Sequence, residues 1–301
     1  MIKELLVLAI GGNALLQRGE PLEYSYMQKN INKVSKIISA IINDYKIIIV
    51  HGNGPQVGLL SLQSNAYKEV PPYPFDILNA ESQGMIGYLL QQTLANYIQN
   101  IPITTLITQV LVDQKDLAFK LPTKFIGPVY NKQESEDLSN RYGWIMKEDG
   151  KFYRRVVASP KPIDIIEIDS ASTLINFNTI VISGGGGGIP CIRDGNKLIG
   201  IEAVVDKDYT AALLAKKLKA DKFIILTDVD AVYDNFGTAK SKPIREIDVA
   251  TLKGHRFPSG SMQPKVDAVC DFVSSTNKTS SIGALDKLLE ILNRRSGTLI
   301  K

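Results

Sequence analysis

The sequence has few of the residues that build disulfide frameworks and metal sites. Its 301 residues include only two cysteines, Cys191 and Cys270, and two histidines, His51 and His255. The cysteines have neither CxxC spacing nor the Cys/His spacing of zinc ligands, which argues against a disulfide scaffold and a structural zinc site. We therefore expect both thiols in the core and the protein in the cytoplasm. His51, next to a glycine turn, is expected to anchor its loop.

Long apolar runs and a strong charge bias are also absent. No run approaches the roughly 20 apolar residues of a membrane span. The apolar opening leads into Gly11-Gly12-Asn13 without a small-residue cleavage pattern, so it is interpreted as a buried first strand and not as a signal peptide. The net charge of +4 comes from scattered residues, which predicts no nucleic-acid partner and no membrane surface, but is compatible with a small anionic ligand.

Two common phosphate motifs are missing as well. The chain has no GxxxxGK[ST] and no G-x-G-x-x-G, which disfavours a P-loop enzyme and a nicotinamide-dependent oxidoreductase. It has instead five successive glycines, Gly184 to Gly188, directly after an apolar run. Glycine in an ordered element costs roughly 0.5–1 kcal/mol relative to alanine, so we expect something to come very close to this backbone.

Several segments repeat one plan, in which a short apolar run ends in a glycine or polar turn and a helical pattern follows. The runs are residues 5–10, 46–50, 179–183 and 223–226. Alternation of this kind predicts an α/β fold with an open, mainly parallel sheet and helices on both faces. Ligands bind outside the carboxyl ends of the strands in such sheets, and the glycine turns lie there.

One stretch departs from this plan. Residues 113–162 are rich in charge, proline and aromatic side chains. The pattern alone fits either an ordinary surface excursion or a protruding lid subdomain inserted into the main fold.

Motifs along nearly the whole chain resemble, in order, those of carbamate kinases within the amino-acid kinase family. The resemblance implies a three-layer α/β/α sandwich with an eight-stranded sheet, which assembles as a homodimer. It implies one domain over residues 1–301, with an acyl-substrate lobe over about 1–205, a lid over about 113–162 and a nucleotide lobe over about 206–301. The motifs are AIGGNAL, VHGNGPQVG, ESQGMIGYLLQQTL, TQVLVDQKDLAF, LPTKFIGPVY, YRRVVASPKP, SGGGGGIP, GIEAVVDKDYTAALLA, ILTDVDAVY and SGSMQPKVDA.

The reaction implied is reversible phosphoryl transfer between ATP and carbamate, which gives ADP and carbamoyl phosphate. Carbamate is already an anion, so it needs no general base, and a sequence with two histidines suits it. The difficulty is the approach of a negative nucleophile to a negative phosphate, which cationic and N–H donors relieve. The resemblance assigns this role to Lys124, Lys207 and Lys265, and makes Asp208 the carboxylate that holds the lysines. Each lysine could otherwise be a solvated surface charge, and Asp206 a helix cap.

The three glycine turns are expected to bind anions through their backbone N–H groups. The first two, on the acyl-substrate side, supply Gly11, Gly12, Asn13, Gly52, Asn53 and Gly54, although asparagine beside glycine is also a common turn residue. On the nucleotide side we expect Gly184, Gly185, Gly186, Thr227, Asp228, Tyr233, Met262 and Lys265. Tyr233 and Met262 could equally be core residues. Mg²⁺ is expected with ATP or ADP, held mainly by phosphates and water and not by side chains.

Three points stay open. Gln263 stands where the family usually has glycine, and would add a side chain beside the nucleotide pocket. Arg154 and Arg155 could bind a substrate anion or hold the lid to the core. The alternatives for function are another small-carboxylate or phosphate kinase of the same family, or a nucleotide-binding regulator that has lost turnover.

Overall fold

A central sheet of eight strands organises the computed structural model, which describes residues 3–17, 19–67, 69–258 and 261–301. In sheet order the strands are β15 (Glu246–Ile247), β17 (Thr298–Ile300), β16 (Ser280–Ala284), β12 (Lys222–Thr227), β1 (Glu4–Ile10), β2 (Tyr45–His51), β9 (Ile180–Ile182) and β3 (Ile103–Thr105). Neighbouring strands are parallel, apart from the antiparallel pair β16 and β17. The predicted mainly parallel sheet is confirmed.

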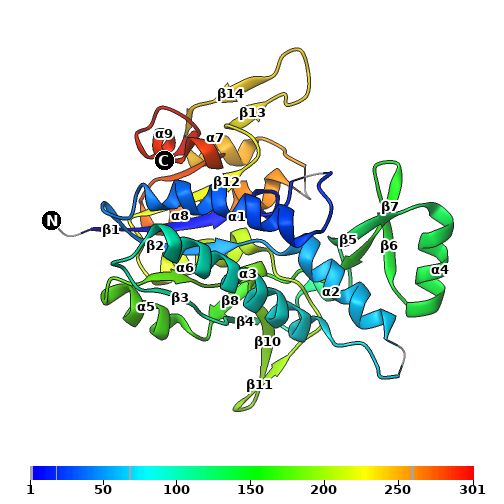
Figure 1. The fold of residues 1–301 in the computed structure, drawn as a ribbon. Coiled ribbons are helices and arrows are strands. Elements are labelled where there is room, and N and C mark those ends of the chain that lie inside the picture. Colours follow the sequence, from blue (N-terminus) through cyan, green and yellow to red (C-terminus); the bar gives the residue numbers. More distant parts are fainter. Residues whose placement is uncertain (1–2, 18, 68, 259–260) are drawn as a thin grey trace.

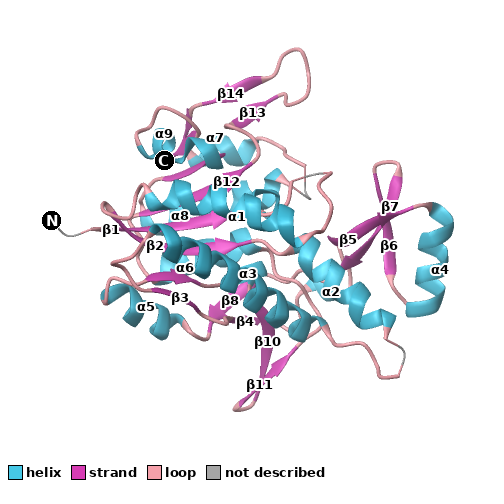
Figure 2. Cartoon of the chain, in the orientation of Figure 1, coloured by secondary structure: helices cyan, strands magenta, loops and turns pink. Residues whose placement is uncertain are grey.

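Helices cover both faces of this sheet, which gives the three layers (Figures 1 and 2). In β1, Leu6, Leu8 and Ile10 are buried against one helical layer, and Val7 and Ala9 against the other. Because both faces are covered, the strand is continuously apolar from Leu5 to Ile10 instead of alternating. The first layer holds α1 (Tyr24–Ser39), α3 (Phe75–Tyr97) and α9 (Leu288–Leu292); the second holds α5 (Ile168–Asn176), α6 (Lys207–Lys217), α7 (Val249–Gly254) and α8 (Met262–Thr276).

A small subdomain stands away from the sandwich, at the right of Figure 1, next to α2 (Gly54–Ala66). It has an antiparallel sheet of its own, in the order β5, β7, β6, and one helix. The helix begins with a capping box between Asn131 and Glu134 and ends at Gly143, which has a left-handed φ of 67°. The elements are β5 (Lys124–Tyr130), α4 (Lys132–Tyr142), β6 (Ile145–Asp149) and β7 (Phe152–Val157). This folded unit lies inside the predicted 113–162 segment.

Two further sheets complete the fold. A four-stranded sheet lies below α3 in Figure 1, and a hairpin projects near α7. Their strands are β11 (Lys197–Gly200), β10 (Ile189–Asp194), β4 (Gln109–Val112) and β8 (Pro162–Ile165) in the first, and β13 (Val232–Asp234) with β14 (Lys242–Ile244) in the second. Among the described residues, no helix combines the length and the apolar character needed to cross a membrane.

The expectation that a helix follows each turn is wrong at the third glycine turn and also after β12, which is followed by strand β13. The second turn does lead directly into α2, whereas Gly184 to Gly188 lead into strand β10. Four of these five glycines have positive φ, which cannot continue into a right-handed helix. The third turn therefore offers an anion only its own backbone N–H groups, without a helix end behind them.

Candidate active site

The predicted turns meet at one edge of the central sheet. Strands β12, β1, β2 and β9 are consecutive and parallel, so their carboxyl ends lie together. Backbone hydrogen bonds tie the turns to the neighbouring strands: Gly11 N donates to Leu226 O and Gly52 N donates to Ile10 O, each over 3.0 Å. This edge is the place where an α/β sheet binds its ligand.

Three lysines and two aspartates form what we call the lysine cluster: Lys124, Lys207, Lys265, Asp206 and Asp208. Lys124 Nζ donates to Asp206 Oδ2 over 2.5 Å, and Lys265 Nζ donates to Asp208 Oδ2 over 2.9 Å. Lys207 Nζ donates to the other oxygen of Asp208. Asp206 also caps α6, because its Oδ1 accepts the Asp208 N–H. The structure thus brings together lysines from β5, α6 and α8.

The cluster carries positive charge in a largely buried setting. Burial alone would raise the pKa of Asp208, but Lys207 and Lys265 hold that pKa well below its usual range. Burial lowers the pKa of Lys207, and Asp208 offsets only part of this effect. Burial also acts on Lys265, yet the carboxylates of Asp208, Asp206 and Asp228 together raise its pKa. Three ammonium groups against two carboxylates leave one net positive charge, which attracts an anion.

The first two turns connect to different parts of the protein. Asn13 Nδ2 donates to Asp228 Oδ2 over 2.8 Å, which joins the first turn to the residues after β12. Asn53 is buried, and its Nδ2 donates to Asn79 Oδ1 and Ser82 Oγ of α3 over 3.1 and 2.8 Å. Both N–H groups of the Asn53 amide are therefore bonded within the protein, and its oxygen is the atom left to accept.

The glycine run is packed against the protein itself. A Cβ on Gly185 would lie 2.3 Å from His51 Nε2, one on Gly186 would lie 2.2 Å from Asn53 Nδ2, and one on Gly187 would lie 2.1 Å from Val205 O. All five glycines are buried. The close approach expected from the sequence is thus made by the loops that carry the cluster, and the run fixes the backbone just before Asp206.

We expect Gly187→Ala to destabilise the protein by about 2–4 kcal/mol, because φ is +96° and the added Cβ meets the Val205 carbonyl. Urea unfolding measures this. Gly195→Ala is the matched control: φ is +57°, with no atom within 4 Å of the added Cβ, so only about 1 kcal/mol of backbone strain is expected. If both variants lost the same free energy of unfolding, the close contact of Gly187 with Val205 would not be the cause.

His51 and Gln263 serve their own loops. His51 is buried and its Nδ1 lies 3.1 Å from Gly52 O; burial lowers its pKa to about 4, so the ring is neutral. Gln263 Oε1 accepts the Phe257 N–H over 3.2 Å, and its Nε2 donates to Asp267 Oδ1 over 2.8 Å. Its side chain therefore spans the base of the loop before α8. Ser259 and Gly260 of the SGSMQPKVDA motif lie outside the described residues.

Tyr233 and Met262 have contacts of a different kind from the cluster residues. Tyr233 OH donates to Asp230 Oδ1, and its ring meets the edge of Phe236 at 5.7 Å. Met262 packs against the hydrophobic core on the α8 side of the sheet. In the described part of the chain, these side chains thus contact Asp230, Phe236 and the core, and not the lysine cluster.

The two arginines of YRRVVASPKP hold the subdomain. Arg154 Nε donates to Gly127 O over 2.7 Å, within the subdomain. Arg155 lies over the rings of Phe75 and Trp144, at 4.7 and 4.2 Å. Of the two roles left open, attachment of the lid to the core is supported for Arg155, whereas Arg154 binds within the lid.

Sequence reasoning missed a buried polar row on α3. Asn79 binds Asn53, while Gln83 exchanges two hydrogen bonds with the backbone of Thr108, over 3.1 and 2.9 Å. Thr108 Oγ1 in turn accepts the Gly184 N–H over 2.9 Å. A signal was present, since Asn79, Ser82 and Gln83 have i, i+3, i+4 spacing and so share one helix face.

The lysine cluster and the glycine turns form a candidate anion site at the carboxyl edge of an α/β sheet, and comparison with known proteins identifies the family. Residues 4–283 match the amino acid kinase family, and the chain belongs to that family. It is 50% identical over 295 residues to the carbamate kinase of Escherichia coli K12, covering 98% of each chain. Carbamate kinase from Giardia lamblia bound to AMP-PNP has a TM-score of 0.91 at 39% identity, covering 99% of this chain and 98% of that one. Its citric acid complex has a TM-score of 0.93 at 40% identity, with the same coverage.

Proposed function

We propose that this protein is an ATP-dependent carbamate kinase, which reversibly transfers a phosphoryl group between ATP and carbamate. The observation that carries the proposal is the lysine cluster: three ammonium groups from three separate elements converge on Asp206 and Asp208. One ammonium comes from the subdomain, so closure of that unit over the site would bring charge and exclude water together. The identity of about half the residues to a carbamate kinase over nearly the whole chain supports the choice of substrate.

The chemistry requires positioning and charge, and no proton transfer. Carbamate attacks the γ-phosphorus in line, and negative charge spreads over the phosphoryl oxygens and the bridging oxygen. Lys124, Lys207 and Lys265 donate to these oxygens, while Asp208 fixes two of the ammonium groups. The low pKa of Asp208 keeps it ionised, so it organises the lysines and does not act as a base. This arrangement works equally in both directions.

We assign the two substrates to opposite sides of the cluster. On the acyl side lie Gly11, Gly12, Asn13, Gly52 and Gly54, where the N–H groups of Gly11 and Gly52 are bonded to strand carbonyls and hold the turns in place. The Asn53 oxygen is the acceptor for the carbamate NH₂. On the nucleotide side, the N–H groups of Gly185 and Gly186 are assigned to phosphate, because those of Gly184, Gly187 and Gly188 are bonded within the protein. Thr227, Asp228, Tyr233 and Met262 are proposed to lie along the nucleoside.

Mg²⁺ is proposed to enter on the nucleotide phosphates, where it neutralises charge. In the described parts of the chain, no group of three or more His, Cys, Asp or Glu side chains could hold a metal. Asp206 and Asp208 are both occupied by lysines. The side chains thus fit a cation held largely by phosphates and water, as is usual for Mg²⁺ at phosphoryl-transfer sites.

The direct test is ATP formation from ADP and carbamoyl phosphate. We expect turnover with carbamoyl phosphate and none with acetyl phosphate. In the reverse direction we expect none with N-acetylglutamate as the phosphoryl acceptor from ATP. Turnover with either of these would favour a different small-carboxylate kinase. Nucleotide binding without any transfer would identify a regulator of the same fold.

The pH dependence of kcat should show an alkaline limb. Lys207 has a lowered pKa, so it loses its proton below the usual lysine value of about 10.4, whereas Lys265 has a raised pKa and keeps its proton longer. We therefore expect kcat to fall with a midpoint below about pH 10.4. Lys207→Arg stays charged, so any activity it retains should lack this limb. A limb that persists in Lys207→Arg would rule out Lys207 as its source.

We also propose a homodimer, which the family resemblance implies, and a cytoplasmic location, which the cysteine usage indicates. Both described thiols are buried and unpaired, which supports a protein that works without disulfides. Analytical ultracentrifugation of the purified protein tests the dimer.

A further inference from the structure

The subdomain places Lys124 at its junction with the rest of the protein. Lys124 is the first residue of β5, and it pairs with Val157, the last residue of β7. Its side chain reaches Asp206, which belongs to the sandwich. The position of this ammonium group therefore depends on how the subdomain is fixed to the main fold.

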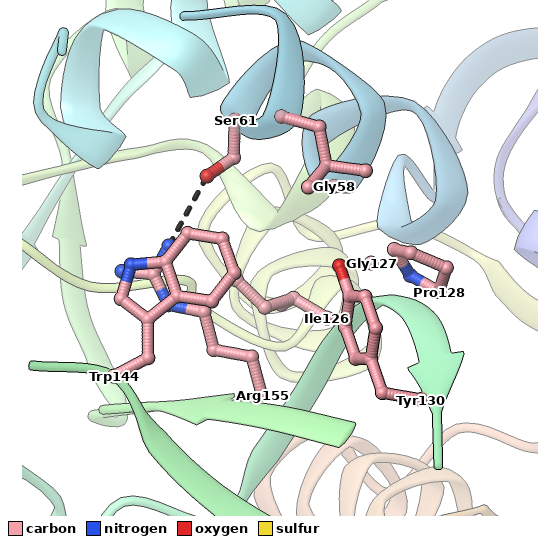
Figure 3. A pocket seen from close by; sticks show the side chains of 9 residues that line it. Gly58, Ser61, Ile126, Gly127, Pro128, Tyr130, Trp144 and Arg155 are labelled. Atoms are coloured by element: carbon pink, nitrogen blue, oxygen red, sulfur yellow. Dashed lines mark hydrogen bonds between the residues drawn. The ribbon is translucent and has the colours of Figure 1, made fainter. Parts of the chain in front are cut away.

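Arg155 of β7 bridges the two bodies. Its guanidinium lies between the rings of Phe75, the first residue of α3, and Trp144, which precedes β6. Arg155 Nη1 donates to Ser61 Oγ of α2 over 3.1 Å, as the dashed line in Figure 3 shows. One side chain thus joins the helices α2 and α3 to the subdomain. A planar guanidinium suits this site because it stacks on rings and donates at its edge together.

The subdomain and α2 are also in close backbone contact. A Cβ on Gly58 of α2 would lie 2.1 Å from the Gly127 Cα of β5, so the two backbones touch directly. Beside this contact is an open cavity of about 340 Å³, bounded by both bodies and lined in part by Tyr73, Phe75 and Arg155. Ile126 and Val157 of the subdomain are also buried against Val57, Phe75 and Leu78 of α2 and α3. The subdomain therefore packs on these two helices through an apolar contact, and Arg155 adds a polar and stacking link beside the cavity.

Glu202 connects Arg155 and Phe75 to the segment that carries Asp206. Its Oε2 accepts the Phe75 N–H over 2.8 Å, and its Oε1 lies 3.9 Å from Arg155 Nη2. Four residues further along the chain is Asp206, the partner of Lys124. Arg155 thus belongs to β7, which pairs with the strand that carries Lys124. Its guanidinium also lies close to Glu202, in the segment that leads to Asp206.

We propose that Arg155 is a positioning residue for phosphoryl transfer, which holds the subdomain on α2 and α3 and so keeps the Lys124 ammonium at the reaction site. This inference rests on the proposed function and adds a residue that touches neither substrate. A small displacement of a reacting group costs up to about 10²-fold in rate. We expect Arg155→Ala to lower kcat by about 10-fold to 10²-fold, with the affinity for ADP unchanged.

A double-mutant cycle with Lys124 tests the route of this effect. If Arg155 acts through Lys124, Arg155→Ala should change kcat less than about twofold in a Lys124→Ala background. An equal loss of kcat in both backgrounds would overturn the proposal, because a general structural defect or direct substrate contact acts independently of Lys124. Arg155→Lys keeps the charge without the planar stack, and should recover only part of the activity. Lys147→Ala, an exposed lysine of β6, is the control and should retain wild-type kcat.

Hydrogen exchange provides a readout that needs no activity. Arg155→Ala should speed exchange across residues 124–157 and leave the central strands unchanged, whereas Lys147→Ala should alter neither. Unchanged exchange in Arg155→Ala would also overturn the proposal. If the wild-type protein formed no ATP, the proposed function would fail, and this measurement would still decide whether Arg155 holds the subdomain.

Discussion

Replacing Lys124 by alanine should lower kcat for ATP formation by about 10²-fold to 10³-fold, the size of effect seen when one preorganised transition-state donor is lost. Lys124 supplies the only ammonium group that the described part of the subdomain sends to Asp206, over 2.5 Å. Without it, Asp206 is left as a buried carboxylate facing the incoming phosphate. Because the lysine is proposed to act on the transferring group, the loss should appear in kcat more than in the affinity for ADP.

Lys120→Ala is the matched control for this experiment. Lys120 is an exposed lysine four residues earlier in the same inserted segment. Its removal should leave kcat within about twofold, since a solvated charge at this distance is largely screened. If Lys124→Ala retained wild-type turnover, the catalytic role of the subdomain would be wrong, although the nucleotide site could still stand.

Asp208→Ala should have the largest effect on stability, about 3–5 kcal/mol by urea unfolding at pH 7, and should also abolish measurable turnover. Asp208 is the partner of both Lys207 and Lys265, so its loss leaves two buried ammonium groups without their counterion. Breaking a buried ion pair from one side is costly for this reason. Asp271→Ala removes the exposed partner of Lys216 on α6, and should cost no more than about 1 kcal/mol.

The sign of the pH dependence adds a second check on Asp208. Its pKa in the folded protein is held below the unfolded value of about 3.9 by Lys207 and Lys265. The stabilisation is therefore fully present above about pH 4 and is lost as the pH falls through the lower folded value. The difference in unfolding free energy between the wild type and Asp208→Ala should be constant from pH 5 to 8 and shrink in stronger acid. A difference that grew in acid would contradict the assignment.

The sheet and the turns were predictable because they depend on local sequence. The apolar runs of β1, β2, β9 and β12 each end in glycine or polar residues, and parallel strands must gather those ends at one edge. Lys207 and Asp208 follow the N-cap Asp206 on one helix, so their proximity is also a local property.

The contacts across the site could not be obtained from local patterns. Lys124 and Asp206 are 82 residues apart, and they meet because long-range contacts set the subdomain against α2 and α3. These contacts are the Arg155 stack on Phe75 and Trp144 and the buried packing of Val157. The glycine run was likewise expected to make room for a ligand. The residues that face the Cβ side of the run, His51, Asn53 and Val205, could not be named in advance, because their approach depends on how three turns pack together.

The most direct test of the account is a crystal structure of the protein with MgADP, carbamate and a planar phosphoryl mimic such as aluminium fluoride. The account predicts the Nζ atoms of Lys124, Lys207 and Lys265 within about 2.7–3.2 Å of the mimic's ligands or of the oxygens that flank it. Asp208 should still bind two of these lysines. A complex in which Lys124 and Lys265 both lie beyond hydrogen-bonding distance of the transferring group would contradict it.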